Sequence, residues 1–246
     1  MPKVLIFTLA AAGYDWLYKK NIQSHKAYIA KHAYSYSVVN RPRLTTLGLE
    51  LVWLKIYLMR EALKSNYDWL VCLDADTEIR PSCPAIESLE KQGKSIYLAK
   101  GYSDRINSGV LILRNDNNSR AFINNIIQNQ LKPLAPEDDV GWGENGHVIH
   151  FAKNNPYVEI IDKRWNNNSD CEMKDFIRHY SAGPMRAKHT PPLVGKSAWL
   201  MLHLLMAIFN RIPGLRDNKE EIRSSLEKLT TETLKYHRNL LTPLHY

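Results

Sequence analysis

Short apolar runs alternate along the chain with longer segments in which apolar residues recur at helical spacing. The short runs, rich in β-branched residues, suit buried strands. The expected strands are 3–10, 34–39, 68–73, 95–99 and 110–113, and the expected helices are 14–33, 47–63 and 120–130. This alternation predicts an α/β fold with a mostly parallel central sheet flanked by helices. In such sheets, ligands bind beyond the carboxyl ends of the strands.

The composition is that of a soluble globular protein, with 44% hydrophobic and 24% charged residues in a chain of 246. A net charge of +8 favours an anionic partner, and nucleic acid, an acidic membrane and a phosphorylated substrate all qualify. A solvated basic surface explains the charge equally well. The three cysteines show no CxxC spacing, so neither a disulfide framework nor a zinc site is indicated. The first apolar stretch is too short for a secretory signal, and we expect a reducing, cytoplasmic setting.

The chain divides by composition into two parts. We expect residues 1–190 to form the main domain and residues 191–246 to form a helical C-terminal extension. Residues 217–240 are predicted as a charged amphipathic helix, with Asp217 as its N-cap and an acidic residue three positions later.

The start of the extension is densely apolar. Residues 198–209 lie between Lys196 and Arg211 and are fewer than the roughly 20 apolar residues of a membrane-spanning helix. A core or oligomer-interface helix explains them, and so does a helix lying at a membrane surface with basic flanks. Residues 193–212 are therefore candidates for a homodimer contact or a peripheral membrane contact.

Two aspartates directly follow the third expected strand. Asp74 and Asp76 stand two residues apart, and paired carboxylates repel each other unless a positive charge lies beside them. Hard oxygen ligands of this kind suit Mn²⁺ or Mg²⁺, which commonly also bind phosphate oxygens. Ordinary turn residues explain the same pair, because Asp is common in turns. The position after an apolar strand favours the metal site.

A third ligand and two cations follow later in the chain. His179 comes after a short strand-like run and precedes a loop that contains glycine. A neutral imidazole can complete a metal site with two carboxylates, although a lone histidine is more often a surface or core residue. Arg186 and Lys188 follow closely and are candidates to bind a diphosphate.

Two further segments carry candidate polar groups. Asn107 and Gly109 precede a strand, where the glycine allows a ligand to approach the backbone, although a simple turn explains them too. Glu144 and Asn145 begin an expected helix. The helix dipole stabilises an acid at that position, which accounts for Glu144 without any catalytic role.

The order of these motifs resembles a known family. The segments run VWLKIYLMREAL, DWLVCLDADTEI, INSGVLILRN, WGENGHVIHFAKN, RWNNN and IRHYSAG. Their order is similar to that in the retaining glycosyltransferases of family 34 and, more distantly, family 8, over roughly residues 3–188. The resemblance implies the GT-A fold, in which a Rossmann-like sheet binds a nucleotide sugar at an Asp-x-Asp motif.

The resemblance also implies roles for single residues. Asp76 and His179 match the metal ligands, and Asp74 matches the residue that contacts the ribose or the metal. The donor-binding candidates are Thr8 and Tyr14 for the base and ribose, Lys55 near the donor, and Asn107 and Gly109 near its sugar. Glu144 and Asn145 match the acid and amide beside the reacting carbon. Three features depart from the family: the glycine after His179 comes one place later, at Gly183, a Lys-Pro-Trp motif is absent, and Asn145 replaces a more usual Gln.

Taken together, the sequence predicts a metal-dependent glycosyltransferase. The donor would be a UDP- or GDP-sugar, the cofactor Mn²⁺ or Mg²⁺, and the acceptor a glycan or lipid-linked glycan, with retention implied by the resemblance. A nucleotidyltransferase is the alternative enzyme, but residues 10–14 lack the basic loop that it would need. A nucleic-acid-binding protein is the non-enzymatic alternative, although the basic residues are scattered.

Overall fold

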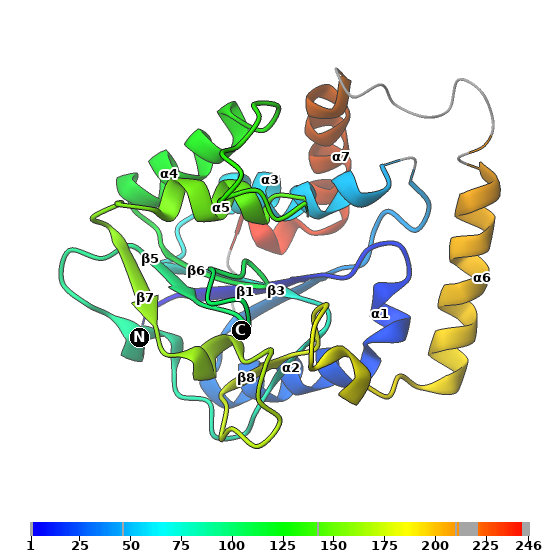
Figure 1. Ribbon diagram of the computed structural model, residues 1–246, viewed down its shortest axis with the longest axis horizontal. Coiled ribbons are helices and arrows are strands. Elements are labelled where there is room, and N and C mark those ends of the chain that lie inside the picture. Colours follow the sequence, from blue (N-terminus) through cyan, green and yellow to red (C-terminus); the bar gives the residue numbers. More distant parts are fainter. Residues whose placement is uncertain (1, 46, 142, 210, 212–220, 243–246) are drawn as a thin grey trace.

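The computed structural model describes residues 2–45, 47–141, 143–209, 211 and 221–242 (Figure 1). A six-stranded sheet lies at its centre, in the order β2-β1-β3-β6-β5-β7. Only β6 among these strands runs antiparallel to its neighbours. The strands are β1 (Val4–Leu9), β2 (Ser35–Val39), β3 (Trp69–Asp74), β5 (Ile96–Ala99), β6 (Val110–Arg114) and β7 (Val158–Ile161).

Helices cover both faces of this sheet (Figure 1). One face carries α3 (Leu54–Ala62), α4 (Asn117–Gln128), α5 (Asn145–Ala152) and α7 (Ile222–Tyr236). The other carries α1 (Tyr14–Leu17), α2 (Lys19–His32) and a small antiparallel sheet of β4 (Thr77–Ile79) and β8 (Ile177–His179). The helix α6 (Leu193–Phe209) stands at the edge of the molecule.

The strands β1, β3, β5 and β6 are mostly apolar because both of their faces are buried. In β1, Leu5 and Phe7 join the core beneath α3 and α4, while Val4 and Ile6 join the core beside α2. All four side chains are almost completely buried. The α/β fold with a mostly parallel sheet flanked by helices is therefore confirmed.

The structure departs from the predicted elements in several places. The helix expected over 47–63 is a 3₁₀ helix over Leu49–Trp53 followed by the α-helix α3. The expected helix 14–33 is interrupted at Tyr18, whose backbone is not helical, so α1 and α2 are separate helices. The short strands β4 and β7 were not predicted. The helix expected over 120–130 begins earlier, at Asn117, because the Asp116 carboxylate accepts a hydrogen bond from the Ser119 backbone and caps it. The expected cap at Asp217 lies outside the described residues.

The two C-terminal helices are seated differently. Ile222 and Leu226 of α7 belong to the main core between the sheet and its helices. In contrast, α6 packs on α1 and contributes only Leu202 and Met206 as buried side chains. No helix in the part of the chain that the structure describes is long and apolar enough to cross a membrane. The division at residue 190 stays a prediction.

Candidate active site

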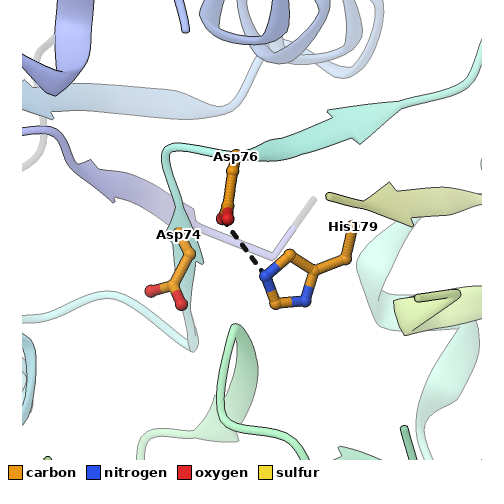
Figure 2. Close-up of side chains that lie close together, drawn as sticks. All are labelled: Asp74, Asp76 and His179. Carbon is orange, nitrogen blue, oxygen red and sulfur yellow. Dashed lines mark ion pairs between the residues drawn. The ribbon is translucent and has the colours of Figure 1, made fainter. Parts of the chain in front are cut away.

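Three of the predicted residues meet at the carboxyl end of β3. Asp74 is the last residue of β3, and Asp76 follows just before β4. Because β4 pairs with β8 and places Thr77 opposite His179, the histidine comes to lie beside Asp76. Their potential ligand atoms all lie within 4.8 Å of one another, and His179 Nε2 is 3.1 Å from Asp76 Oδ1 (Figure 2). Two carboxylates and an imidazole are a donor set that fits Mn²⁺ or Mg²⁺.

The orientation of the His179 ring is determined by Asn166. His179 Nδ1 lies 2.8 Å from Asn166 Oδ1, and Asn166 Nδ2 lies 2.8 Å from the Asn107 carbonyl oxygen. Since a carbonyl oxygen only accepts, the Asn166 amide nitrogen must face Asn107 and its oxygen must face His179. His179 Nδ1 is therefore the donor in this pair, and Nε2 is the nitrogen that can offer a lone pair to a cation.

Gly109 forms the surface on which the His179 ring rests. A Cβ at Gly109 would lie 2.7 Å from Nδ1 and 2.9 Å from Nε2 of the histidine, inside the 3.0 Å that real Cβ contacts respect. The glycine reaches this position because β6 is antiparallel to β3, so the residue before β6 lies at the end of β3. There the Asp74 backbone N–H donates to the Gly109 carbonyl at 2.9 Å.

A buried lysine links the site to α3 and α5. Lys55 Nζ lies 2.9 Å from Asp74 Oδ1 and 2.7 Å from Glu144 Oε1, and the Lys55 side chain is only 3% exposed. The Ser108 hydroxyl also donates to Glu144, at 2.7 Å. Burial alone would lower the pKa of Lys55, but the charges of Asp74 and then Glu144 outweigh it and raise that pKa. The lysine therefore stays charged between the two acids.

The charges around Asp76 come from His179 and Arg186. Burial alone would raise the pKa of the Asp76 carboxyl, but the charge and hydrogen bond of His179, with the charge of Arg186, outweigh burial and lower that pKa. Arg186 Nη1 lies 3.8 Å from Asp76 Oδ2, and the guanidinium also contacts the Tyr18 hydroxyl. Asp74, Asp76 and Glu144 face the cations of Lys55 and Arg186, so the acids of the site outnumber these two cations by one, which suits a divalent cation.

Comparison with solved structures shows which proteins share this fold. No family model matches the sequence, and no curated protein matches it. Among solved structures, a glycosyltransferase involved in glycosylation of the major capsid of PBCV-1 is 15% identical, with a TM-score of 0.60, covering 81% of this chain and 100% of that one. The apo form of the glycosyltransferase GlyE of Streptococcus pneumoniae is 12% identical, with a TM-score of 0.54, covering 92% of this chain and 64% of that one.

An active-site mutant of LgtC is 12% identical, with a TM-score of 0.52, covering 82% of this chain and 95% of that one. The chain has a glycosyltransferase fold. Identities of 12% to 15% show a shared fold alone, and the evidence for an activity comes from the residues of the site. The narrower resemblance to family 34 has no sequence match and stays a prediction.

The other predicted residues lie around this centre in different settings. The Asn107 side chain accepts a hydrogen bond from the Gly109 backbone N–H. The Asn145 side chain accepts one from the Ser108 backbone N–H, so both asparagines hold the loop before β6. Tyr14 stacks on Tyr18, and burial followed by the charge of Asp76 raises its pKa.

Thr8 and Lys188 lie at opposite extremes of exposure. Thr8 is fully buried, and its hydroxyl is hydrogen-bonded to His25 and Tyr36. Lys188 is exposed, on the same short turn as Arg186. The ligand roles predicted for these residues stay predictions.

Two site residues were not singled out from the sequence. Asn166 is fully buried and holds both His179 and Asn107. Ser108 connects Glu144 to the loop before β6. Asn166 stands in a run of three asparagines, all buried, and that run was the only signal in the sequence.

Proposed function

We propose that this chain transfers a sugar from a nucleoside-diphosphate sugar, such as a UDP- or GDP-sugar, to a hydroxyl group of an acceptor. The observation that carries the proposal is the convergence of Asp74, Asp76 and His179 within 4.8 Å at the carboxyl end of β3. This set suits Mn²⁺ or Mg²⁺, and such ions bind nucleotide phosphates through one or two protein carboxylates. The glycosyltransferase fold supports the same activity.

A bound cation would neutralise the charge that builds on the departing diphosphate. Arg186 is half exposed beside Asp76, and its guanidinium would donate to phosphate oxygens on the same side, with Lys188 on the same turn. Lys55 holds the Asp74 carboxylate in place through their 2.9 Å ion pair. These residues would thus receive the leaving group without supplying a covalent nucleophile.

The loop before β6 is proposed to contact the donor sugar. Asn107 and Gly109 lie in this loop, and Glu144 and Asn145 hold it through Ser108. Glu144 is almost fully buried and paired with Lys55, so we propose that it acts by positioning this loop. Tyr14 is proposed to contact the base or ribose, and the fully buried Thr8 to support this region through its hydrogen bonds to His25 and Tyr36.

The remaining parts of the proposal come from the sequence resemblance. They are transfer of a hexose or pentose with retention of configuration, through same-face attack assisted by the leaving phosphate. The proposed acceptor is a glycan or lipid-linked glycan rather than nucleic acid, and the proposed location is cytoplasmic.

The test measures donor binding and turnover together. Thermal unfolding is followed with nucleoside diphosphates and their sugars, with and without Mn²⁺, and we expect stabilisation by one donor only when metal is present. Release of a nucleoside diphosphate from that donor is then measured for Asp76→Asn, which should lose both metal dependence and turnover.

The matched control is Asp68→Asn, because Asp68 is exposed at the opposite end of the same strand, where it accepts from the Lys3 backbone. It should behave as the native chain. Normal turnover of Asp76→Asn, or release of pyrophosphate instead of a nucleoside diphosphate, would contradict the proposal.

A further inference from the structure

The helix α6 is seated on α1 by a narrow strip of contacts. Leu202 and Met206 are its buried side chains, and they pack with Ala12 near the end of β1. At Gly195 the helix approaches so closely that a Cβ would lie 2.9 Å from the Trp16 carbonyl carbon and closer still to its oxygen. These contacts determine which side of α6 turns away from the protein.

The outward side of α6 is a continuous apolar face. Six aliphatic side chains on it are between 50% and 83% exposed: Val194, Leu200, Met201, Leu204, Leu205 and Ile208. Their spacing of three, four and seven residues places them along one face of a 17-residue helix at the edge of the molecule (Figure 1). A monomeric soluble protein rarely leaves so large an apolar face exposed, so we look for a surface that covers it.

The charge around α6 indicates which kind of surface could cover its apolar face. Between Asp175 and Asp217 the sequence contains no acidic residue, while Lys188, Lys196 and Arg211 are exposed basic residues of this stretch. Lys196 lies on the exposed side of α6 itself. A second copy of the chain would bring two such basic stretches together, whereas an anionic lipid surface complements them.

We propose that α6 lies in the plane of an anionic bilayer surface. Its apolar face would enter the boundary between headgroups and acyl chains, with the basic side chains among the headgroups. The seat of α6 also borders the candidate site. Trp199 and His203 contact the ring of Tyr14, which stacks on Tyr18, and the Tyr18 hydroxyl contacts Arg186 beside Asp76. Docking would therefore hold the candidate site next to the membrane.

The test uses the full chain without donor or metal, so its outcome is independent of the proposed activity. Flotation with vesicles of phosphatidylcholine and phosphatidylglycerol (7:3) should show binding that weakens in high salt and on vesicles of phosphatidylcholine alone. The triple variant Met201→Ser/Leu204→Ser/Ile208→Ser should bind about 100-fold more weakly, because it removes half of the apolar face. Lys196→Glu should lower binding about tenfold.

The matched control is Leu131→Ser/Tyr157→Ser/Ile160→Ser, three exposed apolar residues elsewhere on the molecule, which should bind as the native chain. Circular dichroism checks that each variant is folded. Three results would overturn the proposal: no vesicle binding, equal binding to neutral vesicles, or unchanged binding of the α6 variant. A dimer seen by analytical ultracentrifugation and abolished by that variant would also overturn it, because a second copy would then cover the face.

A different observation carries a second inference, which rests on the proposed metal site. The geometry points to Asn166 as a positioning residue that accepts a hydrogen bond from Nδ1 of His179 and so turns Nε2 toward Asp76 and the cation. The chain of contacts runs from the Asn107 carbonyl through the Asn166 amide to the imidazole, with both steps at 2.8 Å. Partners of this kind commonly orient metal-binding histidines.

Ring ¹⁵N NMR of the chain in the presence of saturating Mg²⁺ tests the tautomer, and calorimetry with Mn²⁺ tests the consequence. We expect Nδ1 of His179 to carry the proton, and Asn166→Leu to weaken Mn²⁺ binding about 10–100-fold. Asn166→Asp keeps an acceptor for Nδ1 and should restore much of the affinity. Asn168→Leu is the matched control, because Asn168 is equally buried but bonds to Tyr102 and Ser181 instead of His179.

A native His179 protonated on Nε2 alone would overturn this inference. So would Mn²⁺ affinity unchanged in Asn166→Leu, or lowered as much in Asn168→Leu. Failure of the native chain to bind Mn²⁺ would instead count against the proposed function itself, which separates the two outcomes.

Discussion

Replacing Gly109 by alanine is a sharp test of the metal centre, because the change adds one methyl group directly against a proposed ligand. The added Cβ would lie 2.7 Å from Nδ1 and 2.9 Å from Nε2 of His179. The backbone of Gly109 does not have a positive φ, so alanine fits its conformation. The expected loss of metal binding therefore comes from the clash with the ring. The ring must therefore move, and it is only 2% exposed between Asn166 and Asp76.

The size of the effect follows from the tolerance of metal coordination. Ligand distances hold to within about 0.2 Å, so a ring displaced by roughly 1 Å no longer coordinates the cation. We expect Gly109→Ala to weaken Mn²⁺ binding about 100-fold and to lower the free energy of unfolding by about 1–3 kcal/mol. Isothermal calorimetry and urea unfolding measure the two quantities.

A double-mutant cycle with His179→Ala supplies the control. The three atoms nearest to the added methyl group all belong to the imidazole, so once the ring is gone Gly109→Ala should cost almost nothing further in that background. Native Mn²⁺ affinity in Gly109→Ala, or an equal loss of stability in both backgrounds, would refute the reasoning.

Three further predictions concern buried groups. Lys55→Met leaves Asp74 and Glu144 without their shared cation and should lower the free energy of unfolding by about 3–5 kcal/mol in urea titrations, with Lys55→Met/Glu144→Gln losing less. Burial lowers the pKa of His25 from 6.5 to about 4 against an opposing hydrogen bond to the Thr77 carbonyl. The unfolded chain then binds the proton more readily, so stability should fall as pH drops through this range, by up to about 3 kcal/mol, and His25→Gln should flatten the profile. Leu226→Ala in α7 should cost about 2–5 kcal/mol because Leu226 is fully buried in the main core; a loss below about 1 kcal/mol would show that α7 is not part of that core.

The sequence predicted the central sheet because β1, β3 and β6 are buried on both faces and are therefore apolar at nearly every position before their last residues. The small strands β4 and β7 escaped prediction for opposite reasons. Strand β4 has only three residues and forms by pairing with β8, far along the chain. Strand β7 is short, and its Ile160 is 44% exposed, so its burial pattern does not alternate.

The predicted metal-site residues follow the same logic. Asp74 and Asp76 are marked by the apolar strand before them, and the structure brings His179 to them through the β4–β8 pairing. The supporting contacts were not predictable, because the partners of Asn166 and Lys55 are set by how distant segments pack. Periodicity along the sequence carries no information about which side chains from distant segments contact each other in the fold.

The seat of α6 has a practical consequence. The contacts of α6 with α1 and Ala12 come from Gly195, Leu202, Met206 and the rings of Trp199 and His203. The exposed residues on the far side of the helix lie outside this set. The residues that hold α6 against α1 and the apolar residues exposed on its outer side are therefore different positions of the same helix. An experimenter can replace Met201, Leu204 and Ile208 with polar residues to obtain a readily handled protein whose candidate active site keeps its native surroundings.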